Sequence, residues 1–203
     1  MEWCDLMKNT TLDYYAANAE AFAAQTQQVD FSDIQEQFAD IIPAGAFILD
    51  FGCGAGRDTK VFLEKGFQVE AWDGSAELCR LASDYTGIEV KHRLFQELSC
   101  SDVYDGIWAC SSILHLPADE LRNVLEKISK ALKPGGVLYT SFKYGDFSGE
   151  RNGRFFTDFK EDSFEQLLAQ IPDLSIIKSW RTGDVRPGRE AEQWLNLLLR
   201  KSL

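Results

Sequence analysis

A glycine-rich turn directly follows an apolar run, and its spacing suits a nucleotide-containing ligand. Its alternating glycines are Gly52, Gly54 and Gly56. Glycine lets the backbone turn tightly and approach a ligand closely, because it carries no Cβ. The dinucleotide fingerprint G-x-G-x-x-G/A would place its last glycine or alanine where this chain has Arg57. The third glycine therefore comes one residue early for a pyrophosphate, which argues against a dinucleotide.

An acidic residue, Asp73, ends the next apolar run. A carboxylate at this place can accept hydrogen bonds from both hydroxyls of a ribose. The alternative is that Asp73, Gly74 and Ser75 form only a turn and a helix cap. Because the glycine turn lies upstream, we expect Asp73 to bind a ribose, with Gly74 beside it.

One histidine stands where a catalytic group would be useful. His115 is one of two histidines and follows the fourth apolar run. Imidazole titrates near neutral pH, so His115 is a candidate general base and substrate contact, or else a packed loop residue. Ser111, just after the same run, is expected to line the cofactor. His92 lies within a predicted strand and is expected to be structural.

Aromatic and cationic residues in two further segments suit a planar or anionic ligand. Residues 144–157 are rich in glycine and charge, and read either as a mobile loop or as a substrate lid. The substrate-binding candidates there are Tyr144, Arg151 and Arg154. Near the N-terminus, Tyr15, Asn18 and Phe22 share one helix face. This face either packs on the core or forms a lid in which Tyr14 or Tyr15 touches the cofactor.

These residues require a scaffold in which strands and helices alternate. Strands are predicted at residues 47–51, 67–72, 88–93, 104–110, 137–142, 174–180 and 193–199. Helices are predicted at residues 12–28, 31–42, 59–65, 75–85, 117–132 and 162–171. This order predicts a Rossmann-like, doubly wound α/β fold with a mostly parallel seven-stranded sheet. The last two strands have no helix between them, so they should form an antiparallel pair at one edge. We expect one domain over residues 1–203, with an N-terminal helical cap at 1–43 and an α/β core at 46–203.

Composition narrows the classes of partner and compartment. The chain of 203 residues has a formal net charge of −11, which disfavours a broad phosphate-binding footprint and hence nucleic acid. Its five cysteines form no C-x-x-C pair, which favours reduced thiols in the cytoplasm over disulfides or a metal site. No signal peptide is apparent, and no apolar run approaches the roughly 20 residues that span a bilayer. We expect a cytoplasmic protein with no membrane or metal partner; the oligomeric state stays open.

Three motifs together resemble class I S-adenosylmethionine-dependent methyltransferases over nearly the whole chain. They are the acid and glycines of residues 50–56, the acid Asp73, and Leu-Lys-Pro-Gly-Gly at residues 132–136 before the fifth strand. The trailing antiparallel strand matches that family too. The small size and the Gly-Arg-Asp continuation at residues 56–58 resemble the tellurite-resistance-type and other small-molecule methyltransferases.

The resemblance implies cofactor roles. The three glycines would lie along the methionine part of S-adenosylmethionine, and Asp73 would hold the ribose. Asp50 would orient the turn or contact the amino group. Arg57 would pair with the cofactor carboxylate, unless it is a solvated residue of the first helical turn.

The chain departs from the family pattern where an acid often binds the adenine amino group. After the third strand it reads Leu-Phe-Gln-Glu-Leu at residues 94–98, with no Asp at the expected place. Phe95 either stacks on the base or belongs to the core, and Gln96 or Glu97 would bond the edge of the base.

The resemblance implies in-line methyl transfer to a small-molecule acceptor. Two rival functions keep the fold: a non-catalytic S-adenosylmethionine-binding regulator, and an NAD-dependent oxidoreductase. The glycine spacing and the antiparallel ending weigh against the oxidoreductase. A nucleic-acid methyltransferase is disfavoured because the chain has neither an Asn/Asp-Pro-Pro-Tyr/Phe tetrapeptide nor a Pro-Cys pair. A protein acceptor stays open.

Overall fold

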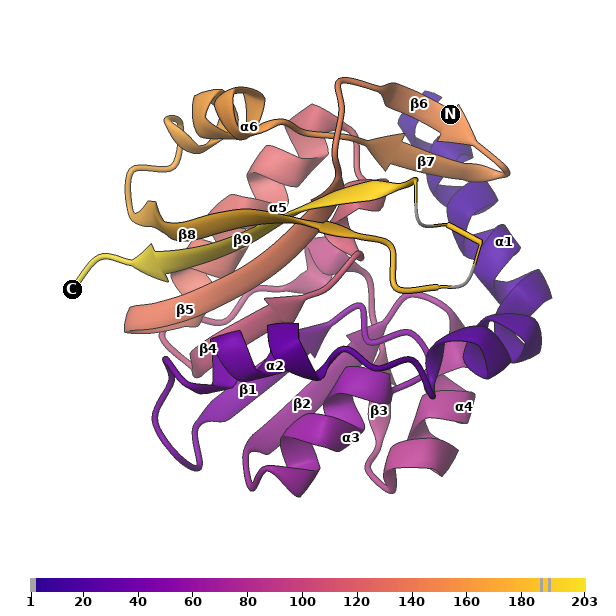
Figure 1. Cartoon of the computed structure of the whole chain (residues 1–203), viewed down its shortest axis with the longest axis horizontal. Coiled ribbons are helices and arrows are strands. Elements are labelled where there is room, and N and C mark those ends of the chain that lie inside the picture. Colours follow the sequence, from indigo (N-terminus) through magenta and orange to yellow (C-terminus); the bar gives the residue numbers. More distant parts are fainter. Residues whose placement is uncertain (1–2, 187, 190) are drawn as a thin grey trace.

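A seven-stranded sheet forms the centre of the protein in a computed structural model that describes residues 3–186, 188–189 and 191–203, with side chains from Thr10 onward (Figure 1). The strand order is β3-β2-β1-β4-β5-β9-β8. Their bounds are Val90–His92, Gln68–Asp73, Phe47–Phe51, Tyr104–Ala109, Leu132–Lys143, Gln193–Lys201 and Leu174–Gly183. β9 is antiparallel to both β5 and β8, whereas the other pairs are parallel. The predicted Rossmann-like sheet with an antiparallel last strand is confirmed.

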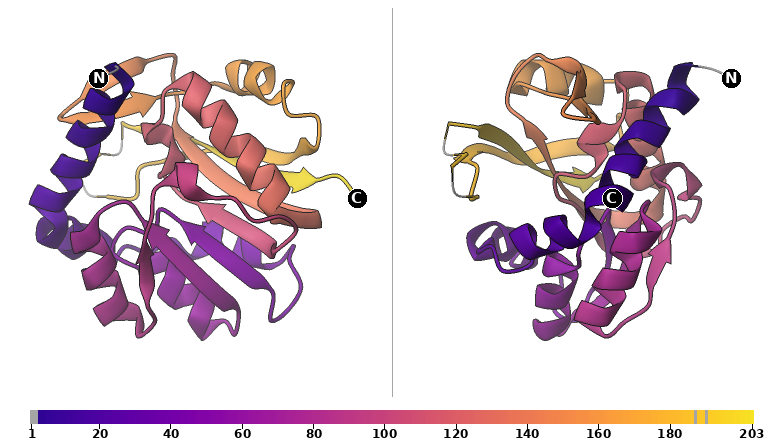
Figure 2. Two further views of the ribbon diagram at one scale, coloured as in Figure 1. Left: turned by 180° about the vertical axis from the view of Figure 1, so that it is seen from behind. Right: turned by 90° about the vertical axis from the view of Figure 1, so that its right-hand side faces the viewer.

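Helices cover both faces of the sheet, as a doubly wound fold requires (Figures 1 and 2). The helices are α1 (Trp3–Thr26), α2 (Ser32–Ala39), α3 (Arg57–Glu64), α4 (Ala76–Thr86), α5 (Ala118–Ala131) and α6 (Glu161–Leu168). α2 and α3 pack on one face through Phe38 and Phe62, while α5 and α6 pack on the other through residues such as Leu125 and Phe164. None of the described helices is long and apolar enough to cross a bilayer.

Trp108 anchors the face that α2 and α3 cover. It comes from β4, the central strand, and its ring stacks on that of Tyr139 with centroids 4.0 Å apart. Phe38 and Phe62 meet the same indole edge-on, and all four side chains are fully buried. Its one polar atom, Nε1, donates to the carboxylate of Asp58 at 2.8 Å. The apolar core is thereby joined to the first turn of α3.

The segment predicted as a mobile loop is instead a β-hairpin. β6 (Ser148–Arg151) pairs antiparallel with β7 (Arg154–Thr157). The two residues between them, Asn152 and Gly153, both have positive φ, at 50° and 74°. Asn-Gly is the preferred pair for such a two-residue turn, so this signal was present in the sequence. The hairpin places Phe155 and Phe156 against the rest of the protein, where both are buried.

α1 lies across the carboxyl edge of the parallel strands (Figure 2). Leu12 and Phe22 approach the turns after β2 and β1: a Cβ built on Gly74 would lie 2.8 Å from Leu12, and one on Gly54 would lie 3.0 Å from Phe22. The residues of β7 also contact α1, since the Phe155 amide donates to the Thr11 hydroxyl at 3.0 Å. α1 and the hairpin therefore meet above the edge where the glycine turn lies.

Replacing Gly56 by Ala should destabilise the fold more than the same change at Gly87. Both glycines have positive φ (84° and 80°), which costs alanine about 1–2 kcal/mol. A Cβ on Gly56 would also lie 2.8 Å from Thr86 Cγ2, whereas at Gly87 there is nothing within 4 Å. We expect Gly56→Ala to lose about 1–3 kcal/mol more than Gly87→Ala in urea unfolding without ligand. Equal losses would show that the contact with α4 is unimportant.

Candidate active site

A cavity of about 600 Å³ opens beneath α1 and the β6–β7 hairpin, at the carboxyl ends of β1, β2, β4 and β5. Ligands of open α/β sheets bind at this edge. The predicted site residues that line it are Tyr15, Gly52, Gly54, Arg57, Asp73, Gly74, Phe95, Gln96, Ser111, His115 and Arg154. The predicted residues Asp50, Gly56, Tyr144 and Arg151 are not part of this lining.

The glycine turn is held tightly by its surroundings. The amides of Gly52 and Cys53 both donate to the Trp72 carbonyl at 2.9 Å. Gly52 has a φ of 87°, and a Cβ there would lie 2.5 Å from Ser112 Cβ and 3.1 Å from the Phe95 ring. Gly56 serves packing instead, since its missing Cβ makes room for Ala82 and Thr86 of α4. Only the first two glycines therefore face the cavity.

Asp73 is fixed by two backbone amides. Its Oδ2 accepts from the Gly54 amide at 2.8 Å and its Oδ1 from the Ser75 amide at 2.9 Å. A carboxylate oxygen can accept two hydrogen bonds, so each oxygen keeps one acceptor site. Burial raises the pKa of Asp73 to about 6, against the opposing effect of the two amides. The side chain can thus bind a pair of hydroxyls while it is ionised.

Asp50 and Arg57 are occupied by protein partners. Asp50 is 2% exposed and accepts from the Thr59 hydroxyl at 2.5 Å; burial and the charge of Asp58 raise its pKa to about 8. It holds α3 against β1 behind the turn and is not part of the cavity lining, which agrees with a role in orienting the turn. Arg57 is not a solvated residue, because its Nε and Nη2 donate to Asp58 at 2.7 and 2.9 Å. A buried guanidinium needs a counter-charge, and here its chain neighbour provides it.

His115 is a weaker base than a free imidazole, because its surroundings disfavour the charged ring. Its Nδ1 lies 2.6 Å from the Phe155 carbonyl oxygen, which can only accept, so Nδ1 carries the hydrogen. In the neutral ring Nε2 is then the acceptor, and it receives the Tyr15 hydroxyl at 2.9 Å. Burial lowers the pKa of His115 to about 4, and the nearby charge of Arg154 adds to this effect. His115 is therefore neutral at physiological pH and orients Tyr15.

The face of α1 that carries Tyr15 and Phe22 lies over the cavity, which agrees with the lid interpretation. Both side chains line the cavity, and their ring centroids are 5.3 Å apart. Asn18, predicted on the same face, donates to the Tyr14 carbonyl instead. The Tyr15 oxygen also lies 3.4 Å from Arg154 Nη1. Burial raises the pKa of Tyr15, so its hydroxyl keeps its proton.

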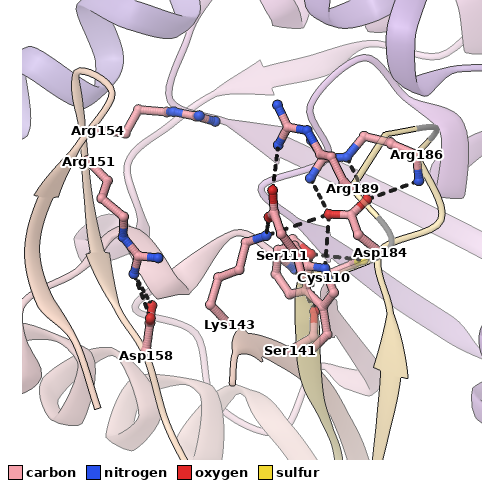
Figure 3. A network of polar contacts seen from close by, with 12 residues as sticks. Cys110, Ser111, Ser141, Lys143, Arg151, Arg154, Asp158, Asp184, Arg186 and Arg189 are labelled. Carbon is pink, nitrogen blue, oxygen red and sulfur yellow. Dashed lines mark hydrogen bonds and ion pairs between the residues drawn. The ribbon is translucent and has the colours of Figure 1, made fainter. Parts of the chain in front are cut away.

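The substrate-binding candidates of residues 144–157 separate into two groups. Arg151 donates to both carboxylate oxygens of Asp158 and turns away from the cavity, whereas Arg154 extends across it (Figure 3). Tyr144 lies under Arg181 and donates to Glu161 at 3.1 Å. Its neighbour Lys143 lines the cavity instead. Successive residues of an extended chain point to opposite sides, and the sequence alone does not show which side is inward.

The adenine candidates also have protein contacts. Phe95 packs edge-on against Phe51, with ring centroids 4.8 Å apart, as expected of a core residue. Its ring also lines the cavity, so it can still contact a base bound there. Gln96 Nε2 donates to Glu120 at 2.8 Å. Ser111 has a φ of 52°, and its amide donates to Ser141 Oγ at 2.9 Å.

Sequence reasoning missed a polar cluster at the far wall of the cavity. Its centre is Asp184, which accepts from Arg186 Nε and Nη2 at 2.9 and 2.6 Å and from Trp194 Nε1 at 3.1 Å. Lys143 pairs with Asp184 at 3.5 Å and with Glu192, and burial lowers the pKa of Lys143 to about 8 (Figure 3). The antiparallel order of β8 and β9 brings their connection to the carboxyl edge of the parallel strands. That topology was predicted, so the cluster's position could have been found.

The comparisons with known proteins agree with this site. Residues 48–136 match the sequence profile of the family described as methyltransferase domain. This part of the chain therefore resembles methyltransferase domains in sequence. Malonyl-(acyl-carrier protein) O-methyltransferase of Salmonella typhimurium is 29% identical over 177 residues, which cover 81% of this chain and 68% of the relative. Ubiquinone biosynthesis O-methyltransferase of Xanthomonas axonopodis is 32% identical over 110 residues, and these span 51% of this chain but only 45% of that relative.

A solved structure shares the fold of this chain over its whole length. It is 1,6-didemethyltoxoflavin-N1-methyltransferase of Burkholderia thailandensis, with bound 1,6-didemethyltoxoflavin and S-adenosylhomocysteine. The TM-score is 0.78 at 22% identity, and the match covers 100% of this chain and 92% of that one. At this identity the likeness establishes the fold, and the ligands are those of the Burkholderia protein.

The imidazole of His115 should stay neutral and keep its hydrogen on Nδ1 down to about pH 5. Its pKa is lowered to about 4, so ¹⁵N shifts of the ring should show the Nδ1–H form from pH 8 to 5.5. The chain has only two histidines, and a His92→Gln variant assigns the signals. Because the pKa in the unfolded chain is about 6.5, folding stability attributable to this group should fall as the pH drops from about 6.5 toward 4. Titration of His115 near pH 6.5 would contradict its burial.

Proposed function

We propose that this protein transfers the methyl group of S-adenosylmethionine to a small-molecule acceptor. The observation that carries the proposal is Asp73, held by two backbone amides at the end of β2 with one acceptor site left on each oxygen. This arrangement suits the two hydroxyls of a ribose. The Gly52–Gly54 turn beside it lines the same cavity, so its backbone is available to a ligand bound there.

The cofactor would extend across the turn from Asp73 toward α1. Asp73 and Gly74 would hold the ribose, and Gly52 and Gly54 would lie along the methionine part. Phe95 would contact the base with one face while its edge stays packed on Phe51. The remaining lining residues that we place beside the cofactor are Gln96, Ser111, Tyr15 and Arg57. Arg57 would act there mainly by keeping Asp58 in place.

The sulfonium supplies an activated methyl group, so the protein chiefly aligns the acceptor and excludes water. Tyr15 and His115 line the cavity between the glycine turn and the hairpin. The hydrogen bond from Tyr15 to His115 Nε2 fixes the phenol, and the Phe155 carbonyl fixes the imidazole. We assign Tyr15 to contact with the acceptor and His115 to the orientation of Tyr15. Arg154 lies beside them and would contact the acceptor as well.

Several features favour a small acceptor over a macromolecule. α1 and the hairpin cross the edge of the cavity, and the net charge of −11 disfavours nucleic acid. The named relatives comprise O-methyltransferases and an N-methyltransferase. These names do not favour the tellurite-type subgroup over other small-molecule enzymes.

A transfer assay with a labelled methyl group tests the proposal. Purified protein and S-adenosylmethionine labelled in the methyl group are incubated with a cell extract that has been separated into metabolites, protein and nucleic acid. We expect label only in the metabolite fraction. Label in protein or nucleic acid would refute the small-molecule acceptor, and binding of the cofactor without transfer to any fraction would support the regulatory alternative.

Asp73→Ala should weaken the binding of S-adenosylhomocysteine by roughly 1.5–3 kcal/mol, because it removes hydrogen bonds to a charged acceptor. Calorimetric titration measures the change. Asp84→Ala, at an exposed position of α4, is the matched control and should bind as the wild type does. Unchanged affinity in a folded Asp73→Ala protein would remove Asp73 from the ribose site.

Affinity for S-adenosylhomocysteine should also fall as the pH drops through about 6. The pKa of Asp73 in the free protein is raised to about 6, and only the ionised form accepts from both hydroxyls. Binding is therefore strongest above this pKa and is lost below it. Titrations between pH 8 and 5 should show the loss in the wild type, and Asp73→Asn should flatten the profile. A wild-type affinity that is constant down to pH 5 would contradict the assignment.

A further inference from the structure

Arg154 is a cation without a carboxylate partner in the cavity. Its only hydrogen bond among the described residues is the long one from Nη1 to the Tyr15 oxygen, at 3.4 Å. Its Nε is buried and has no partner within the described part of the chain. A guanidinium presents five donors, so most of the hydrogen-bonding capacity of Arg154 is unused. The side chain is half-buried, so leaving these donors without partners costs free energy, which indicates that a ligand completes them.

Three of the other arginines nearby are already neutralised, and a fourth, Arg189, lies 3.9 Å from Glu192. Arg57 is bidentate to Asp58, Arg151 to Asp158 and Arg186 to Asp184. Arg93 also lines the cavity without an ion pair among the described residues, but it directly follows β3, and its amide donates to the Asp73 carbonyl. Arg93 therefore belongs to the ribose end. Arg154 stands at the opposite end, beside Tyr15 and His115.

Aromatic rings hold the Arg154 guanidinium in place. Its Cζ lies 4.3 Å from the centroid of Tyr14 and 5.2 Å from that of Phe156. Both residues come from the elements that cover the cavity, α1 and β7. Figure 3 shows the side chain extending away from the hairpin, in a different direction from that of Arg151. A guanidinium fixed in this way recognises a planar, bidentate anion such as a carboxylate.

We infer that Arg154 binds a carboxylate on the methyl acceptor, so that the acceptors of this enzyme are small planar acids. The inference rests on the proposed function and specifies its substrate class. Tyr15 and Phe156 line the cavity beside the guanidinium and provide flat apolar surface for the rest of such a molecule. The same carboxylate chemistry is present in the methionine part of the cofactor, which is the second possible source. Arg154 lies on the hairpin, away from the glycine turn, and this position favours the acceptor as the source of the carboxylate.

Two matched pairs of probes, each an acid and its carboxamide, separate the charge of the ligand from its shape. Naphthalene-2-carboxylate and benzoate, with their uncharged carboxamides, are titrated calorimetrically into protein saturated with S-adenosylhomocysteine. In the wild type each acid should bind about tenfold or more tightly than its amide, since one charge-assisted pair is worth at least 1.4 kcal/mol. In Arg154→Gln the acid and the amide should bind alike, while Arg154→Lys should keep part of the preference.

Arg80→Gln is the matched control. Arg80 lies on α4, its side chain is 60% exposed, and it pairs with Glu20 and Asp84 outside the cavity. This variant should keep the full preference for the acids. Affinity for S-adenosylhomocysteine should change less than twofold in every Arg154 variant, which also shows that the site is folded.

Three results would overturn the inference. Wild-type protein that does not prefer the acids, or that binds none of the four probes, has no acid site. If Arg154→Gln still binds the acids more tightly than the amides, another residue provides the positive charge. A tenfold loss of S-adenosylhomocysteine affinity in Arg154→Gln assigns Arg154 to the carboxylate of the cofactor. The proposed function itself fails separately, if the wild type does not bind S-adenosylhomocysteine at all.

Discussion

The ion pair between Arg57 and Asp58 is the interaction on which the site depends. Asp58 accepts four hydrogen bonds: two from Arg57, one from Gln35 of α2 at 2.7 Å, and one from Trp108 at 2.8 Å. Although burial opposes ionisation, Arg57 holds the pKa of Asp58 below its usual value. The carboxylate thus fastens the first turn of α3 to the central strand and to α2. Removing one partner of such a buried pair typically costs 3–5 kcal/mol.

The neighbouring carboxyl group, that of Asp50, responds to burial by staying protonated and not by pairing with a cation. Among the described residues, no cation lies within hydrogen-bonding distance of it, and its pKa rises to about 8, so it keeps a proton at neutral pH. Two carboxyl groups at one turn can be buried together when one is paired and the other is protonated. Through Thr59 and Trp108 they attach α3 to β1 and β4. The glycine turn is held between these attachments, which fix the position of the cavity floor.

The roof of the cavity has a different construction. The hairpin is joined to α1 through Thr11 and to the segment after β4 through His115 and Leu116, the last by Thr157 Oγ at 2.7 Å. These are single hydrogen bonds between elements far apart in the chain. We therefore propose that the floor holds the cofactor and that the roof provides the residues that select an acceptor. Loops and covers at this edge generally carry the specificity of α/β enzymes.

The features that were predicted best from the sequence are those that depend on short stretches of the chain. The alternation of strands and helices, the glycine turn and the position of Asp73 follow from short patterns, and the sheet matches the prediction. The state of His115 was not predictable, because it depends on the Phe155 carbonyl, which a hairpin 40 residues later supplies. The same holds for Arg151 and Arg154, which are cross-strand neighbours with different partners. Only the tertiary position of Asp158 decides which of them is neutralised.

The most direct test of the central claim is calorimetric titration of the wild-type protein with S-adenosylhomocysteine, S-adenosylmethionine and NAD in parallel. We expect the first two to bind at one site with micromolar affinity, and NAD not to bind, because Arg57 and Asp58 occupy the place where a dinucleotide fingerprint continues. Binding of NAD alone, or of none of the three, would contradict the methyltransferase site described above.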